Sequence, residues 1–112
     1  YEISVNPAGA VYDLDRAPGG RGVDWSSGAQ VAVYRGADRW SIEMRLPIVG
    51  AEAFTLDPTK GIDGAQPKEL FPWHFNLGRS RIRDGVVERT AYSPTGKEDL
   101  HVPERFAKLW GR

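Results

Sequence analysis

The sequence predicts an all-β fold, an antiparallel β-sandwich of the jelly-roll or immunoglobulin-like kind. The first observation is a strict alternation of apolar and polar residues over short stretches, which places the apolar side chains on one face of a strand. The second is the set of 13 Gly and 8 Pro residues that separate those stretches, as turns separate antiparallel strands. Alternation is clearest where every second residue is apolar, at Trp40, Ile42, Met44 and Leu46.

Seven strands are expected along the chain, and several of the turns between them contain residues that favour a turn. The expected strands are residues 1–5, 11–14, 30–35, 39–47, 73–81, 86–92 and 107–110. Asp84-Gly85 is a hairpin signal between two of them, because both residues tolerate the positive φ that a two-residue turn requires. Pro47 ends its strand because it has no N–H to donate to a neighbouring strand.

The remaining segments are connections. Residues 15–28 contain several Gly and one Pro and indicate an irregular loop. The connection 48–70 leaves room for a short helical turn near residues 50–54. Pro103 can open a single helical turn, because proline is well suited to the first helical position.

Composition excludes several classes of protein. Lys plus Arg and Asp plus Glu are both 15, so no excess charge indicates nucleic acid or an anionic membrane as partner. Cysteine is absent, which rules out disulfides, thiolate metal sites and a cysteine nucleophile. No apolar run approaches the roughly 20 residues of a membrane-spanning helix.

Residue types that carry catalysis are present without a recognisable arrangement. Glycoside hydrolysis needs two carboxylates that face each other across a cleft, and the Asp and Glu residues here are scattered. No nucleophile-elbow pattern is present, so we expect no enzymatic activity. Met and His hold haem in some proteins, which leaves Met44 and His74 open as ligands. The alternative is that Met44 fills a gap in an apolar stripe and His74 lies at the surface.

Two aromatic residues lie where a sugar could stack. Trp25 lies in the Gly-rich loop and Tyr92 at the end of an expected strand. The apolar face of a sugar packs on an exposed aromatic ring, but a loop aromatic can also cover the core. Both interpretations remain open for these residues.

One expected strand begins with apolar residues and ends with Arg79 and Arg81. Gly78 is a natural place for a bulge or a close approach of another segment, and a bulge would change the face on which Arg79 lies. Arg79 either forms an ion pair, for example with Glu43 or Glu88, or contacts a ligand.

Four motifs occur in order along most of the chain. After a Y-E-I-S-V-N-P-A-G opening they are W-S-I-E-M-R-L-P-I at 40–48, W-H-F-N-L-G-R at 73–79, Y-S-P-T at 92–95 and H-V-P-E-R-F-A-K-L at 101–109. With this order and spacing the chain resembles the family 9 carbohydrate-binding modules, whose sandwich is related to the DOMON type. The resemblance implies a secreted bacterial module, extracellular or periplasmic and non-catalytic. Such a module would be attached to a glycoside hydrolase, another polysaccharide-acting enzyme or a cell-surface protein.

The resemblance also implies a site for an oligo- or polysaccharide. A sugar would stack on Trp25 or Tyr92, and its hydroxyls would bond to Asn76, Arg79 and His101. We expect no cofactor, with calcium as the alternative that the resemblance offers, because calcium is common in the best-known members. Two other functions remain open: a structural or interaction sandwich that has lost the sugar site, and a haem-binding DOMON-type electron-transfer domain.

Complete modules of this family are longer and begin with additional strands. The resemblance implies that residues 1–112 form one β-sandwich domain, the C-terminal part of such a module. A half sandwich leaves apolar faces and sheet edges uncovered. We therefore expect the sandwich to be completed by the missing N-terminal segment or by a second copy of the chain.

Overall fold

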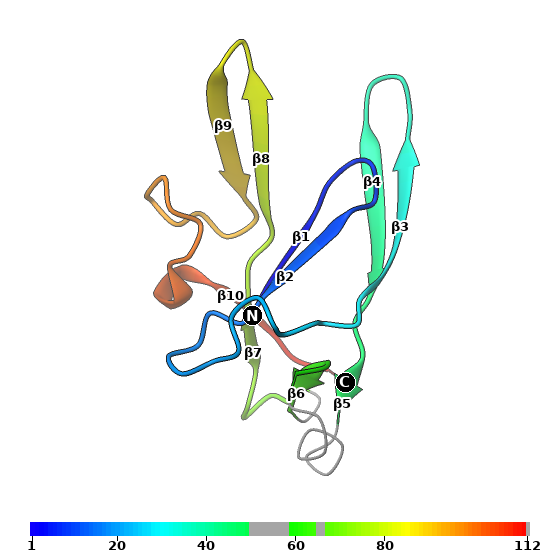
Figure 1. The fold of residues 1–112 in the computed structure, drawn as a ribbon. Helices are drawn as coiled ribbons and strands as arrows, with labels where there is room; N and C mark the ends of the chain where they lie inside the picture. The colour runs from blue at the N-terminus through cyan, green and yellow to red at the C-terminus, as the bar shows by residue number, and fades with distance from the viewer. Residues whose placement is uncertain (50–58, 65–66, 112) are drawn as a thin grey trace. The chain divides into compact units, whose positions relative to one another are not determined.

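A computed structural model describes residues 1–49, 59–64 and 67–111, and it confirms the all-β prediction (Figure 1). The strands are β1 (Glu2–Val5), β2 (Val11–Leu14), β3 (Gln30–Arg35), β4 (Trp40–Arg45), β5 (Ile48–Val49), β6 (Ile62–Asp63), β7 (Trp73–Phe75), β8 (Gly78–Arg83), β9 (Val86–Ala91) and β10 (Ala107–Leu109). Within the described ranges the one helical element is a 3-10 turn, η1 (Pro103–Arg105), where a single turn is predicted. The helical turn predicted near residues 50–54 lies outside the described residues.

The chain divides into two compact units, Tyr1–Ala65 and Gln66–Arg112. The described strands form five two-stranded sheets, three in the first unit and two in the second. Closure of the sheets into a sandwich, and a single domain over residues 1–112, remain predictions.

The first unit contains two antiparallel hairpins and one short parallel pair. β1 pairs with β2 and β3 pairs with β4, while β5 and β6 run parallel. In the first turn the Asn6 side chain accepts hydrogen bonds from two backbone N–H groups, at 2.9 and 3.0 Å, and Gly9 has a φ of 85°. The predicted turn is thus formed by the residues that favour it. β4 ends at Arg45, two residues before Pro47.

The buried part of the first unit is built around Trp25 and Ser27. Trp25 is 2% exposed, its indole N–H donates to the carbonyl oxygen of Gly61 at 2.8 Å, and its ring stacks on Tyr1 at 4.4 Å between centroids. The backbone N–H and the hydroxyl of Ser27 both donate to the Asp13 carboxylate, at 3.0 and 2.9 Å. These bonds satisfy the buried polar groups and tie the loop before β3 to β2 and to the segment before β6.

The apolar face of β4 is only partly covered. Ile42 and Met44, predicted as core positions, are 38% and 39% exposed. Across the hairpin they face Val33 and Val31 of β3. Trp25 is the one fully buried apolar side chain among the described residues. The predicted core stripe of β4 is therefore not buried by this hairpin, because a two-stranded sheet supplies nothing to cover its own face.

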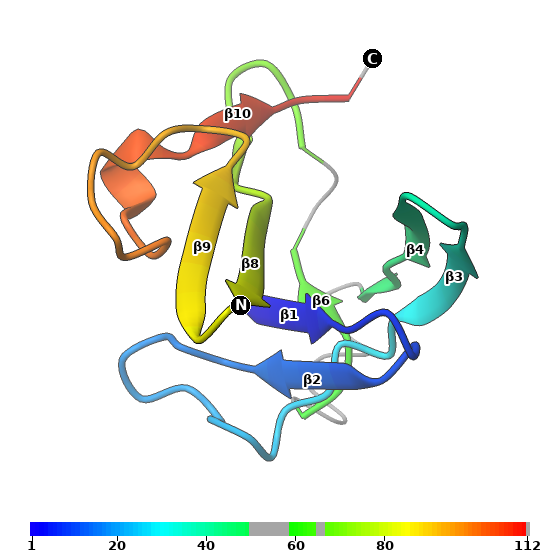
Figure 2. The same cartoon turned by 90° about the horizontal axis from the view of Figure 1, so that it is seen from above.

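The second unit contains two antiparallel pairs, and one of its strands departs from the prediction. β7 pairs with β10, and β8 pairs with β9, which lies beside it in Figure 2. The strand predicted over residues 73–81 is interrupted after β7, at Asn76 and Leu77. Here the Asn76 side chain bonds the backbone of Ser93 and replaces regular strand pairing at this point.

The β8–β9 hairpin is closed by the predicted turn. Asp84 and Gly85 both have positive φ, 51° and 77°, as a two-residue turn of the I′ type requires. At the other end of β8, Gly78 lies so close to Leu100 that an added Cβ would be 2.6 Å from Leu100 Cδ1. The glycine therefore permits the close approach that its position predicts.

Candidate functional site

Four of the five predicted site residues belong to the second unit. They are Asn76, Arg79, Tyr92 and His101. The fifth, Trp25, belongs to the first unit.

Trp25 is the residue whose predicted role the structure does not support. It is 2% exposed, with its ring against Tyr1 and its N–H bonded to the Gly61 carbonyl oxygen. A sugar needs an open ring face, and Trp25 has none. Of the two interpretations of this loop aromatic, the structure favours the one in which it covers the core.

Tyr92 lies at the base of the β8–β9 hairpin with most of its ring exposed. It follows β9 by one residue, and its N–H donates to the carbonyl oxygen of Leu77 at 2.8 Å, so the pairing continues beyond the strands. One side of the ring stacks on Phe75, at 5.8 Å between centroids and 22° between planes. The residue is 69% exposed. The phenol ring thus has a supported side and an open side, which suits the apolar face of a sugar.

The register of the hairpin assigns its side chains to two faces. Side chains alternate along each strand, and directly paired residues share a face. The last pair of the two strands is Gly78 with Ala91, and Tyr92 follows it, opposite Leu77. Tyr92 therefore lies on the same face as Thr90, the second residue before it. We call this the arginine face, and its members are Leu77, Arg79, Arg81, Arg83, Val86, Glu88, Thr90 and Tyr92.

The arginines of this face have no side-chain partner among the described residues. No side-chain hydrogen bond or ion pair joins Arg79, Arg81 or Arg83 to another residue in that part of the chain. The predicted ion pair between Arg79 and Glu88 is not formed, because Glu88 lies opposite Arg81 instead. Glu43, the other predicted partner, belongs to the first unit.

Asn76 fixes the base of the hairpin. Its Nδ2 donates to the carbonyl oxygen of Ser93 at 3.0 Å, and its Oδ1 accepts from the N–H groups of Ser93 at 2.9 Å and Leu77 at 3.0 Å. The amide therefore uses both ends of its side chain on backbone next to Tyr92. We place Asn76 in a positioning role, in which it orients Tyr92, rather than in the ligand contact predicted from the sequence.

His101 is held by a neighbour in its own loop. Its N–H donates to Asp99 Oδ1 at 2.8 Å, and its Nδ1 lies 3.2 Å from the same oxygen. The preceding residue, Leu100, packs against Gly78, whose Cβ direction points to the opposite face from Arg79. The segment that carries His101 therefore approaches the hairpin from the side opposite the arginine face.

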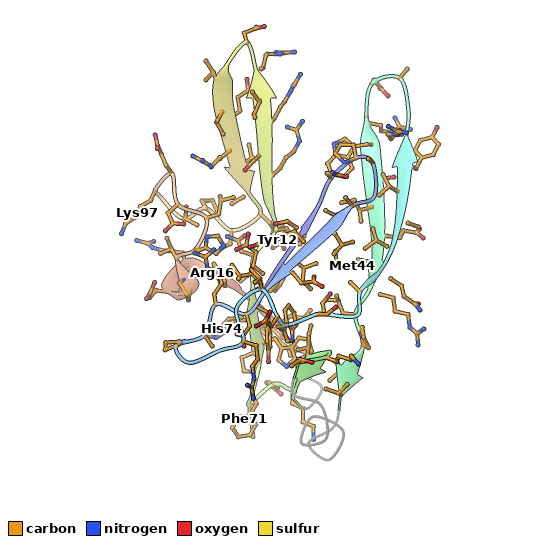
Figure 3. All side chains as sticks on the ribbon, in the orientation of Figure 1. Tyr12, Arg16, Met44, Phe71, His74 and Lys97 are labelled. Carbon is orange, nitrogen blue, oxygen red and sulfur yellow. The ribbon has the colours of Figure 1, made fainter. Side chains whose placement is uncertain are left out.

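That opposite side contains an open hollow of about 760 Å³. It is lined by Val87, Arg89 and Ala91 of β9, by the loop 94–98 and by Leu100. The loop is bonded to itself, since the Thr95 hydroxyl donates to the Lys97 carbonyl oxygen at 2.9 Å and accepts from the Lys97 N–H at 3.4 Å; Figure 3 labels Lys97 there. The hollow is lined by no aromatic side chain, so the arginine face is the stronger candidate for binding a sugar.

The described ranges contain neither a cluster of metal-binding side chains nor a membrane-spanning helix. No group of three or more His, Asp or Glu side chains in those ranges could hold a metal ion. No helix there has the length and apolar character needed to cross a bilayer. Met44 and His74, the two residues of the haem alternative, lie on β4 and β7 in different units, and His74 is exposed opposite Lys108. Haem binding remains an alternative prediction.

Comparison of the chain with protein-family models, with curated proteins and with solved structures finds no match in any of the three. The resemblance to the family 9 modules therefore remains a prediction made from the motifs.

Sequence reasoning missed most of the arginine face. The Asp84-Gly85 turn was the sequence feature that could have revealed this face, because a two-residue turn fixes which residues of the two strands are paired. Counting outward from this turn pairs Arg81 with Glu88 and Arg79 with Thr90. The same count brings Tyr92 opposite Leu77, on the side of the arginines.

Proposed function

We propose that this chain is a non-catalytic carbohydrate-binding module that holds an oligo- or polysaccharide on the arginine face. The observation that carries the proposal is Tyr92, which is 69% exposed, supported by Phe75 and placed at the end of a row of arginines. The motif resemblance to family 9 modules supports the same function. It also supports an extracellular or periplasmic location as part of a polysaccharide-acting or cell-surface protein.

Each residue of the site has a distinct role. The open side of Tyr92 takes the apolar face of one sugar ring. Arg79 supplies guanidinium donors and Thr90, its partner across the hairpin, supplies a hydroxyl, and both groups suit sugar hydroxyls. Trp25 and His101 are left out of the proposed site, because the first is buried and the second belongs to a segment on the opposite side.

The test is a titration of the whole chain with a panel of soluble oligosaccharides, followed by calorimetry. Tyr92→Ala should weaken binding about five-fold, since losing an aromatic contact costs on the order of 1 kcal/mol and each 1.4 kcal/mol is ten-fold. Tyr34→Ala is the matched control, because Tyr34 is also an exposed hairpin tyrosine, at 63% exposure, but lies on β3 in the first unit. Absence of binding to every glycan would refute the proposal, as would equal losses in the two variants.

A second candidate is an interaction domain that is completed by additional strands. The observation that favours it is that all five sheets of the described residues are two-stranded, which leaves sheet edges unpaired. Apolar side chains of the β8–β9 hairpin and of the residue before it are also exposed, with Ile82 at 75% and Leu77 at 65% exposure. The partner would be the N-terminal segment of a longer domain or a second copy of this chain.

A further inference from the structure

Charge is distributed unevenly over the β8–β9 hairpin. Its two strands carry four arginines, and its acidic residues are Asp84 in the turn and Glu88 in β9. Three of the four arginines lie on the arginine face, where Glu88 is the single carboxylate. The fourth, Arg89, lies on the opposite face and lines the hollow.

The three arginines of one face repel one another when the site is empty. They occupy every second position of β8, so their Cα atoms are roughly 6.6–6.8 Å apart along the strand. This spacing is shorter than the screening length of about 8 Å at physiological salt. Within the described residues no side-chain ion pair neutralises them. Anions bound along the strand would relieve the repulsion.

We infer that the ligand of the arginine face is an acidic polysaccharide, whose carboxylate or sulfate groups pair with Arg79, Arg81 and Arg83 while one of its sugar rings stacks on Tyr92. This inference rests on the proposed function and narrows its ligand class. A planar guanidinium offers two parallel N–H donors to an oxyanion, and it is less strongly hydrated than an ammonium group. Arginine is thus the residue type that suits repeated oxyanions at an exposed surface.

The length of the row favours a polymer over a single anion. Arg79 and Arg83 are four residues apart on one strand, which corresponds to roughly 13 Å. A small anion reaches one guanidinium or two adjacent ones, whereas a chain with an acidic group on successive sugars reaches the whole row. Tyr92 extends the same face at the end next to Arg79.

Nucleic acid fits the same face less well. Its phosphate backbone requires an accumulated positive field, but the whole chain has a formal net charge of zero. Glu88 also lies within the row, opposite Arg81, where it would repel a continuous phosphate backbone. A glycan that places an acidic group at Arg81 can still present a neutral hydroxyl to Glu88 across the hairpin.

The experiment titrates the whole chain with four probes. They are an oligouronate, a sulfated oligosaccharide, a neutral oligosaccharide of the same length and a single-stranded oligonucleotide with the same number of charges. We expect the uronate, the sulfated probe or both to bind more tightly than the neutral one, with a preference that decreases as salt is added, because exposed charges are screened.

Variants assign the preference to one face. Arg81→Gln should reduce the preference for the acidic probe roughly two- to five-fold, and the double variant with Arg83→Gln roughly four- to twenty-five-fold. Arg89→Gln is the matched control, because it removes the same charge from the other face of the same hairpin. It should leave the preference unchanged, and unchanged circular dichroism would verify that all variants are folded.

The outcomes separate this inference from the proposed function. Binding of neutral and acidic glycans with equal affinity would overturn the acidic ligand and keep the carbohydrate module. Failure of all three glycans would overturn both. A preference for only the uronate or only the sulfated probe supports the inference and identifies the acidic group. Tighter binding of the oligonucleotide than of either acidic glycan, or an equal effect of Arg89→Gln, would overturn the inference.

Discussion

Replacing Asn76 with alanine should open the junction between β7 and the β8–β9 hairpin. The side chain makes three hydrogen bonds of 2.9–3.0 Å to backbone groups of Ser93 and Leu77. Each such bond contributes roughly 0.5–1.5 kcal/mol net, so their loss should cost about 2–3 kcal/mol of local stability. Asn76→Asp keeps the acceptor oxygen but loses the donor, and it should cost less than alanine.

The assay is amide hydrogen exchange at Ser93, measured by NMR on the whole chain. A loss of about 2 kcal/mol corresponds to roughly thirty-fold faster exchange, since each 1.4 kcal/mol is ten-fold. Asn6→Ala is the matched control, because the Asn6 side chain also bonds backbone N–H groups of a turn, but in the first unit. It should leave exchange at Ser93 unchanged.

One result would refute the reasoning about this junction. If Asn76→Ala changes exchange at Ser93 by less than about three-fold, the three bonds do not hold the base of the hairpin. The positioning role assigned to Asn76 would then fail as well. If the reasoning holds, glycan binding should weaken together with the faster exchange, because Tyr92 precedes Ser93 directly.

Three further predictions concern other parts of the chain. The N–H groups of Arg21 and, to a lesser extent, Ala17 bond the Asp15 carboxylate and lower its pKa below the ordinary value of 3.8. The hydrogen bonds to the charged carboxylate stabilise the fold above pH 3.8, and this stabilisation is lost as pH falls through the lower folded pKa. The difference in stability between wild type and Asp15→Asn should therefore shrink in acid. Urea unfolding at several pH values would measure it. Trp25→Phe should lower stability by about 2–3 kcal/mol in urea unfolding, because it leaves the buried Gly61 carbonyl oxygen without its donor, and a change within about 0.5 kcal/mol would contradict this. Light scattering with intact mass should find residues 1–112 as a dimer or in complex with an additional segment, and a cooperatively folding monomer would contradict completion by added strands.

The parts of the fold that local chemistry controls were predictable from the sequence. The Asp84-Gly85 turn was recognised because few residue pairs tolerate positive φ at both positions. Pro103 at the start of η1 was recognised for a related reason, since its ring presets φ for a helical turn. The all-β class follows from the same kind of signal repeated along the chain.

Features that depend on distant partners were not predictable. The break between β7 and β8 requires Ser93, which is 17 residues from Asn76 in the sequence. The buried indole N–H of Trp25 finds its acceptor in the carbonyl oxygen of Gly61, 36 residues away. In both cases a side chain forms a hydrogen bond with a backbone group far away in the sequence. The alternation of apolar and polar residues does not indicate such a contact.

The β8–β9 hairpin is constrained at both of its ends, by the two-residue turn at Asp84-Gly85 and by the bonds of Asn76 to Ser93. A single residue inserted into β9 cannot shift the pairing gradually, because the side-chain period of a strand is two residues. The insertion either forms a bulge or moves Tyr92 to the face opposite Arg79. Among relatives that use this site, the number of residues between the turn and the tyrosine should therefore vary in steps of two wherever no bulge absorbs an odd residue, even where the residues themselves change freely.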